Sequence, residues 1–168
     1  MHPPVITSST RPTKTNMQPA NRPHPPGHIV GIDEAMIQDL VHAFYARVRK
    51  DPMLAPIFNA AIDDWDAHLD KLCRFWSSVV LMTGRYKGAP MQAHAAQPQI
   101  SGAHFDRWLA LFGETARDRC PPVAAALFID RAERIAQSLE MGLSLHRGRM
   151  LRIGERLAAA APAERQPT

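Results

Sequence analysis

Apolar residues recur along the chain at spacings of three and four positions, which places them on one face of an α-helix rather than alternating as in a strand. A first helix is expected from about Asp33, a residue type suited to an N-cap, and it should end at Asp51-Pro52. Its inner face would carry Met36, Ile37, Leu40, Val41, Phe44, Tyr45 and Val48. The pattern predicts an all-α fold.

The same spacing predicts three more long helices. Residues 56–58 should form one tight turn at a corner, and a helix from about Asp64 to Gly84 should follow it. Another helix is expected from about Ser101, and a last one opens at Pro121-Pro122, since proline suits a first helical turn. The inner side of the last helix is expected to comprise Val123, Leu127, Ile129 or Ala132, Ile135, Leu139 and Leu143.

The segment between the second and third long helices is irregular. Residues 85–102 contain Gly88, Pro90, Pro98 and Gly102, so they have room for no more than a short helical turn around residues 91–95. A structureless stretch of this length inside a compact domain is uncommon and is usually functional or disordered. A short segment that presents one histidine, His94, to the core suits an axial iron ligand.

Both ends of the chain differ from its middle. Residues 1–28 hold seven prolines and few large apolar side chains, and are expected to be a disordered extension. Residues 29–146 are expected to form one domain, and residues 147–168 a basic tail that starts as a helix-like run and then frays.

Charge and cysteine content narrow the function classes. The formal net charge is +4, yet residues 29–143 carry 12 basic and 14 acidic side chains, so the basic excess lies in the tails. Nucleic-acid binding is therefore not indicated. Cys73 and Cys120 lack the close spacing of disulfide or zinc frameworks, and no signal-peptide or membrane-spanning run is visible. A cytoplasmic protein with no membrane association is expected.

Four side chains are candidates for chemistry: His94, His68, Tyr45 and Trp108. Each also has an ordinary explanation. His94 alone could be a surface loop histidine, His68 a boundary histidine on the row of Leu72 and Trp76, and Tyr45 and Trp108 buried side chains with common hydrogen-bond partners. The order of the four along the chain carries more information than any one of them.

That order resembles the group III truncated haemoglobins. The runs that carry the resemblance are FYARVRKDPMLAPIF (44–58), WDAHLDKLCRFW (65–76), RYKGAP (85–90), His94 and HFDRWLALF (104–112), and the resemblance covers about residues 31–143. It implies a shortened globin, a two-over-two helical sandwich around a haem b group.

The resemblance also implies roles for individual positions. His94 matches the proximal iron ligand, Tyr45 and Trp108 match distal donors to a bound gas, and His68 matches a distal histidine that gates ligand access. Phe58, Leu72 and Trp76 match positions that line or back the haem pocket. The implied ligands are dioxygen and other diatomic gases, with nitric oxide, carbon monoxide and peroxide as further candidates. An unidentified reductase is the implied protein partner.

Some alternatives stay open at this stage. His104 could replace His94 as the ligand, although it precedes Phe105 at a helix start and is expected at the surface. Lys71 and Arg85 are candidate partners for the haem propionates or solvated surface charges. Asp39-x-x-His42 has the spacing of a di-metal helical bundle but lacks a second such motif. A cofactor-free helical interaction module is the other alternative.

The implied activity is gas retention rather than bulk transport. Two distal donors should hold a negatively charged ligand tightly, which favours oxygen sensing or chemistry with nitric oxide or peroxide. The sequence does not decide between a nitric oxide dioxygenase, a peroxidase and a protein without enzymatic activity.

Overall fold

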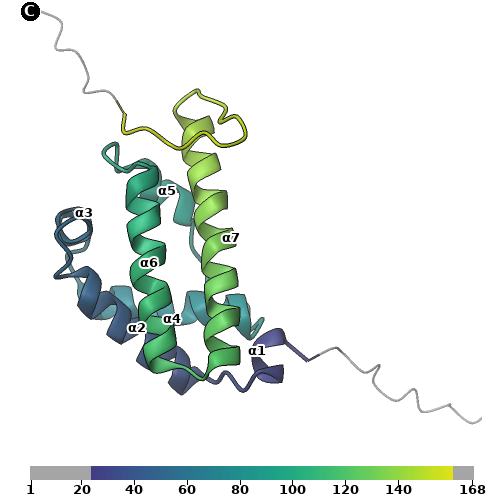
Figure 1. Ribbon diagram of the computed structural model, residues 1–168. Helices are drawn as coiled ribbons and strands as arrows, with labels where there is room; N and C mark the ends of the chain where they lie inside the picture. Colours follow the sequence, from purple (N-terminus) through teal and green to yellow (C-terminus); the bar gives the residue numbers. More distant parts are fainter. Residues whose placement is uncertain (1–23, 161–168) are drawn as a thin grey trace, which may run out of the picture.

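The structure, a computed structural model, describes residues 24–160, and the regular elements in this range are all helices. The expected disorder of residues 1–23 and fraying of residues 161–168 lie outside the described residues. The helices in chain order (Figure 1) are α1 (Pro26–Ile29), α2 (Glu34–Val48), α3 (Ala55–Ala61), α4 (Trp65–Val80), α5 (Pro90–Ala95), α6 (Gly102–Arg119) and α7 (Pro122–His146).

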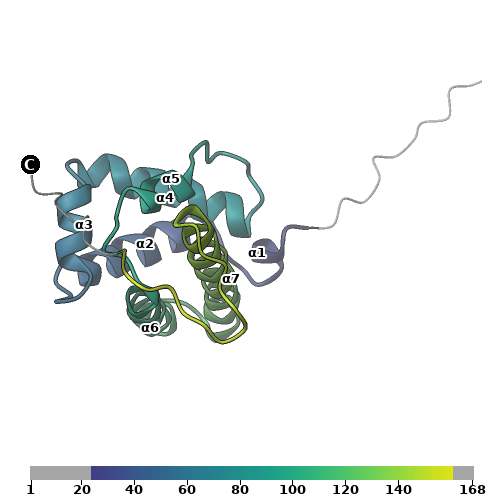
Figure 2. The same cartoon turned by 90° about the horizontal axis from the view of Figure 1, so that it is seen from above.

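Four long helices form two crossed pairs. Helices α6 and α7 lie side by side, and α2 and α4 run across them, as the view from above shows (Figure 2). The short helix α3 lies at one edge (Figure 2), and the short helix α5 packs on α7. The predicted all-α, two-over-two arrangement is confirmed. No helix within residues 24–160 is long and apolar enough to span a membrane.

The predicted starts of the helices follow from their caps. The Asp33 carboxylate accepts a hydrogen bond from the backbone N–H of Met36 at 2.8 Å, and Asp64 accepts one from Ala67 at 3.0 Å. The expected end of α4 near Gly84 is wrong, because α4 ends at Val80. Two residues later the chain enters the left-handed region at Met82, which has a φ of 55° and cannot continue the helix.

The corner after α2 is longer than the tight turn that the sequence predicts. Its start is fixed by the buried Asp51 carboxylate, which accepts hydrogen bonds from the N–H groups of Met53 and Leu54, both at 3.0 Å, and pairs with Arg107 of α6 at 2.7 Å. The following residues then continue as the helix α3. The corner is thereby tied to α6.

Residues 26–28 are helical, although residues 1–28 were expected to form a disordered extension. Helix α1 starts at Pro26, and Gly27 is buried against α4, where an added Cβ would lie 2.6 Å from the carbonyl oxygen of Val80. Only glycine allows this approach, so α1 joins the domain through a backbone contact that has no apolar signal in the sequence.

Helix α7 buries most of the expected face but not its first residue. Val123 is 64% exposed, whereas the buried row consists of Ala124, Ala125, Phe128, Ala132, Ala136, Glu140, Leu143 and Ser144. The small alanine side chains let α6 and α7 approach closely. The Phe128 ring packs against the Trp76 ring, with the two ring centroids 5.7 Å apart. Of the expected residues, Ala132 and Leu143 are buried, and the partly buried ones pack against the core, namely Leu127, Ile129, Ile135 and Leu139. The expectation is therefore wrong only at Val123.

The segment after α7 does not continue as a helix, so the helix-like run expected from residue 147 is wrong. Gly148 and Gly154 have φ values of 71° and 84°, in the left-handed region. The Ser144 hydroxyl donates to the Arg149 carbonyl at 2.7 Å and fixes the turn. Residues 147–160 then fold back across the ends of α6 and α7 (Figures 1 and 2).

Candidate functional site

A cavity of about 520 Å³ lies inside the crossed helices. Its walls come from α2 to α7 and are mainly apolar and aromatic, a lining typical of sites for a sizeable apolar ligand. Every residue proposed for the site contributes to the walls: Tyr45, Phe58, His68, Leu72, Trp76, His94 and Trp108. Residues separated by up to 63 positions in sequence thus meet around one space.

His94 lies on the short helix α5, at one wall of the cavity. Its Nδ1–H can donate to the carbonyl oxygen of Pro90, with the two atoms 2.7 Å apart. Its ring lies nearly parallel to that of Phe105, at 6.4 Å and 15°. With Nδ1 occupied in this way, Nε2 keeps a free lone pair, which is the arrangement of a metal-ligating histidine.

Tyr45 belongs to a different wall, formed by α2. It is only 4% exposed, and its ring contacts those of Phe58, Trp65 and His68 at centroid distances of 5.9, 6.2 and 6.0 Å. Burial raises the pKa of the Tyr45 hydroxyl well above its ordinary value, although the Trp108 side chain opposes part of the rise. The hydroxyl is therefore protonated at neutral pH and able to donate.

Trp108 is held by an aromatic column. Its ring stacks on Phe112 at 5.2 Å and 8°, and Phe112 stacks in turn on Trp76 at 5.0 Å and 13°. Phe44 meets both Trp108 and Phe112 edge-on. Such packing fixes the direction of the indole, whose N–H can only donate.

His68 of α4 lies beside Tyr45 and is half-buried. Burial lowers the pKa of its imidazole, and the positive charge of Lys71 lowers it further. His68 is thus neutral at pH 7. Its ring packs edge-on against Tyr45 and against Trp65, at 6.0 and 5.8 Å, so it closes one side of the cavity.

Comparison with known proteins agrees with this geometry. Residues 28–137 match the family described as "Bacterial-like globin". The chain is 34% identical over 113 residues to the group 3 truncated hemoglobin ctb of Campylobacter jejuni, covering 65% of this chain and 89% of that protein. This chain belongs to the group III truncated haemoglobins. Members of this family bind haem and gases such as oxygen.

Solved structures show the same relationship. The crystal structure of the group III truncated hemoglobin from Campylobacter jejuni superposes with a TM-score of 0.63 at 30% identity, over 74% of this chain and 95% of that one. The group II truncated hemoglobin from Bacillus anthracis gives a TM-score of 0.59 at 26% identity, over 71% and 92% of the two chains. The iron-binding, haem-containing character of the globin family therefore applies to this chain.

The two candidate propionate partners of this globin lie in different places. Lys71 lies on the cavity wall and is exposed to solvent. Arg85 does not line the cavity, because it forms an ion pair with Glu34 and donates to the Ser77 hydroxyl at 2.9 Å. Of the two, Lys71 alone stays a candidate.

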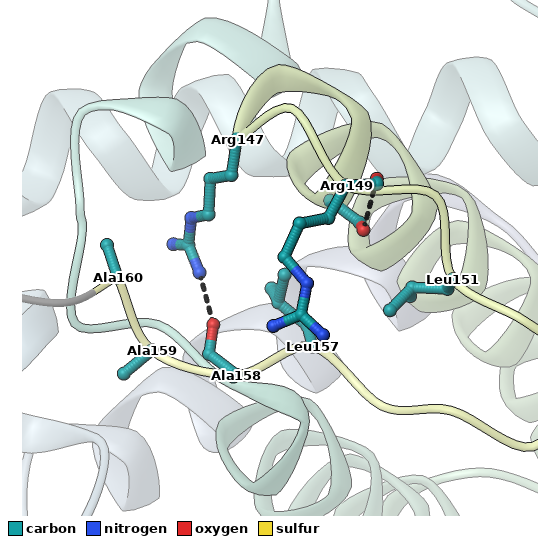
Figure 3. Close-up of a pocket in the computed structure, with 8 residues that line it drawn as sticks. Arg147, Arg149, Leu151, Leu157, Ala158, Ala159 and Ala160 are labelled. Atoms are coloured by element: carbon teal, nitrogen blue, oxygen red, sulfur yellow. Dashed lines mark hydrogen bonds between the residues drawn. The ribbon is translucent and has the colours of Figure 1, made fainter.

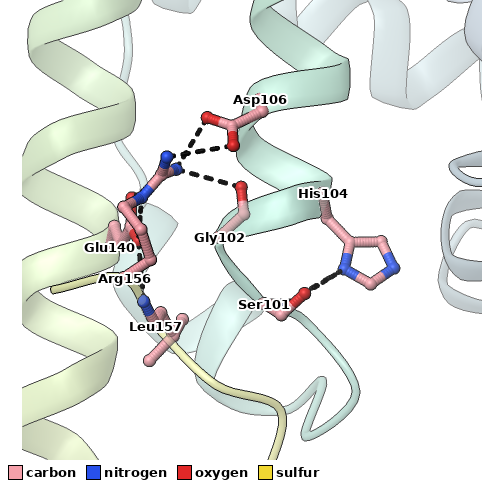
Figure 4. Close-up of polar contacts among 7 residues, drawn as sticks. All are labelled: Ser101, Gly102, His104, Asp106, Glu140, Arg156 and Leu157. Carbon is pink, nitrogen blue, oxygen red and sulfur yellow. Dashed lines mark hydrogen bonds and ion pairs between the residues drawn. The ribbon is translucent and has the colours of Figure 1, made fainter.

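His104 lies at the cavity rather than fully on the surface, contrary to the expectation. It is partly buried and caps α6 together with Ser101 (Figure 4). Its Nδ1 accepts a hydrogen bond from the Ser101 backbone N–H at 3.1 Å. Because that N–H can only donate, the ring proton sits on Nε2, so neither ring nitrogen of His104 offers a free lone pair.

Several lining residues were not assigned to the site from the sequence. They include Ile57, Tyr86, Ile100, Phe105, Ala136 and Leu139. The position of Phe105, three residues before Trp108 on the same helix, was the available signal. Tyr86 lies in the RYKGAP run that carries the family resemblance, and its ring packs edge-on against Phe75 at 5.1 Å.

The di-metal alternative finds no support in the described residues. Within residues 24–160, no group of three or more His, Cys, Asp or Glu side chains comes together as a metal site. Asp39 of the candidate motif instead pairs with Arg119 at 3.1 Å. The cysteines Cys73 and Cys120 are free thiols, and neither lines the cavity.

Proposed function

We propose that this globin binds haem b in the 520 Å³ cavity, with His94 as the iron ligand, and retains dioxygen through hydrogen bonds from Tyr45 and Trp108. The observation that carries the proposal is the bond from His94 Nδ1 to the Pro90 carbonyl at 2.7 Å. This bond leaves Nε2 as a lone-pair donor at the cavity wall, which is what an axial ligand requires.

The residues present fit the group. An apolar, aromatic lining suits a flat macrocycle, and the exposed Lys71 at the wall suits its carboxylates. No cysteine lines the cavity, and the chain has no Cys-x-x-Cys-His run, so covalent attachment is not indicated. These features support haem b rather than a covalently bound haem.

When bound, the haem supplies an iron that takes up a diatomic gas and places partial negative charge on it. Tyr45 is protonated and nearly inaccessible to water, so its hydroxyl donates to this charge without competition from solvent. The Trp108 indole is a second donor held in a fixed direction by Phe112. His68 stays neutral, and its side chain controls the access of ligands to the cavity.

Two donors favour slow release of dioxygen over rapid exchange. A hydrogen bond to a charged acceptor is worth about 1.5–3 kcal/mol, and two such bonds suit sensing or oxygen-dependent chemistry better than bulk transport. Oxidation of nitric oxide and reaction with peroxide are the candidate reactions, and carbon monoxide is a further ligand. Turnover would need a reductase that returns the ferric iron to the ferrous state.

The test is a visible absorption spectrum of the purified full chain, taken with and without dithionite and carbon monoxide. An intense haem band that shifts with carbon monoxide is expected. His94→Ala should abolish stable haem binding, while His104→Ala, the matched control, should retain it. Haem binding that survives His94→Ala but not His104→Ala would overturn the ligand assignment.

The same spectrum distinguishes the other functions. Weak metal-centred bands without a haem band would favour a non-haem metal protein. The absence of any band after haem is supplied would favour an interaction module without a cofactor.

A further inference from the structure

The chain beyond α7 crosses the segment that follows the His94 helix. We call residues 148–160 the strap. It turns at Gly148 and Gly154 and lies across the ends of α6 and α7, beside the connection from α5 to α6 at residues 97–102 (Figures 1 and 2). The match to the globin family ends at residue 137, so the strap is outside the matched region.

Arg147, at the base of the strap, binds the connection directly. Its guanidinium donates to the carbonyl oxygens of Ile100 at 2.9 Å, Ala158 at 2.7 Å and Gln97 at 3.3 Å. One side chain thus joins the end of α7, the strap and the connection. Figure 3 shows its guanidinium reaching the strap beside a second cavity of about 320 Å³.

The strap adds its own backbone bonds to the connection. The N–H of Gly102 donates to the Leu157 carbonyl at 2.7 Å, and the N–H of Ala160 donates to the Pro98 carbonyl at 2.9 Å. Leu157 is 5% exposed and belongs to the same apolar cluster as Ile100 and Phe105. The connection is therefore held at both of its ends and in its middle.

An ion-pair group keeps the strap in place (Figure 4). Arg156 binds the buried Glu140 of α7 at 2.9 Å and Asp106 of α6 at 2.7 Å, and it donates to the Gly102 carbonyl at 3.0 Å. Glu140 also accepts from the Leu157 N–H at 2.8 Å. These contacts fix the strap to both long helices.

Two contacts connect this assembly to His94. The Gln97 N–H donates to the His94 carbonyl at 3.0 Å, and the Phe105 ring lies parallel to the His94 imidazole. Both Gln97 and Phe105 border the elements that Arg147 and Leu157 hold. The strap is thus linked to His94 through one hydrogen-bonded neighbour and one ring contact.

We propose that Arg147 and the strap are positioning elements for His94, which fix the connection at residues 97–102 and with it the direction of the imidazole. The inference rests on the proposed role of His94 as iron ligand. Partners that orient a metal ligand typically change metal affinity by about 10–100-fold when they are removed. Loss of the Arg147 guanidinium should accordingly speed haem release by about tenfold.

The test compares Arg147→Ala with Arg149→Ala in the full chain. Arg149 lines the same second cavity, but its guanidinium makes no hydrogen bond to the described residues, so it is a matched control for lost charge. Haem transfer to an excess of apomyoglobin gives the release rate. Resonance Raman spectra of the ferrous protein give the iron–histidine stretch, and the C–O stretch of the carbon monoxide complex reports the Tyr45 side.

Arg147→Ala is expected to speed haem transfer and shift the iron–histidine stretch, with the C–O stretch unchanged and Arg149→Ala like the wild type. A lower melting temperature with an unchanged release rate and stretch would overturn the proposal, because the role would then be structural only. If Arg147→Ala does not fold, Arg147→Lys decides. It keeps the charge but loses the planar fork, and should show a smaller change in the same direction.

Amide hydrogen exchange in the haem-free protein separates this inference from the proposed function. Faster exchange at residues 97–105 in Arg147→Ala, relative to Arg149→Ala, is expected even before haem is added. Unchanged exchange would overturn the inference while leaving haem binding by His94 intact. A haem band that persists in His94→Ala would instead refute the proposed role of His94 as iron ligand.

Discussion

Removing the Tyr45 hydroxyl should speed the release of dioxygen without changing the fold. Tyr45→Phe deletes one oxygen atom and keeps the ring contacts with Phe58, Trp65 and His68. The hydroxyl is the donor with the least solvent competition, because the residue is 4% exposed. The substitution therefore isolates the hydrogen bond from the packing.

The expected size follows from the burial of the donor. A hydrogen bond to a charged acceptor contributes about 1.5–3 kcal/mol. Since about 1.4 kcal/mol corresponds to a factor of ten, dissociation should accelerate about ten- to a hundred-fold. Trp108→Phe should act in the same direction but less strongly, because Trp108 is more exposed than Tyr45 and water can replace part of its bond.

Stopped-flow mixing of the oxygenated protein with dithionite or excess carbon monoxide measures this rate. Tyr86→Phe is the matched control, since it removes the same atom from the only other tyrosine in the chain, which also lines the cavity. Wild-type rates in both Tyr45→Phe and Trp108→Phe would refute the donor roles. A rate increase of the same size in Tyr86→Phe would show that the effect is not specific to the proposed distal side.

Three further predictions concern stability and access. Burial raises the pKa of Asp51, but bonds from Arg107 and two backbone N–H groups outweigh it and lower the pKa. Asp51→Asn should therefore lower the free energy of unfolding by about 1–3 kcal/mol at pH 7. Below about pH 4 the difference in unfolding free energy between variant and wild type should shrink, because the wild-type carboxylate is then protonated. A difference that stays constant with pH would contradict this. Phe128→Ala should lower the free energy of unfolding in urea by about 3–5 kcal/mol, whereas exposed Val123→Ala should be nearly neutral; equal losses would place Val123 in the core, as the sequence predicts. His68→Ala should speed carbon monoxide association in flash photolysis, and because burial and a nearby lysine lower the His68 pKa, the wild-type rate should not vary between pH 7 and 8. An unchanged association rate in the variant would exclude His68 as the gate.

The sequence predicts the helical core well because the apolar spacing and the caps act locally. Asp33 and Asp64 each accept a hydrogen bond from a backbone N–H three residues later, so each helix start can be predicted from a short stretch of sequence. The glycines and prolines of residues 85–102 likewise limit α5 to a short helix that carries His94. Local chemistry is sufficient for these elements.

Features that depend on distant contacts could not be predicted in this way. Gly27 packs on Val80, and the strap is ordered by Glu140, Asp106 and the carbonyls of residues 97–102, all remote from it in sequence. A basic, alanine-rich segment resembles a helix or a frayed end when its partners are unknown. The sequence shows that the strap contains glycines, but not that Gly148 and Gly154 adopt positive φ values and turn the chain.

The cavity residues were found by their order along the chain rather than by their properties. Tyr45, His68, His94 and Trp108 each have an ordinary explanation alone, and only their assembly around one space makes a site. His104 shows the limit of this approach. Its role as a cap, which fixes its tautomer, depends on the geometry of Ser101.

The aromatic lining also makes the chain its own optical reporter. All three tryptophans, Trp65, Trp76 and Trp108, belong to the cavity wall or contact Tyr45 within it. A pigment that absorbs near 400 nm and sits at that wall would accept excitation energy from every indole in the protein. Tryptophan fluorescence should therefore be strongly quenched when the cavity is filled and intense when it is empty. Its intensity then reports the fraction of filled molecules during purification, reconstitution or loss of the pigment.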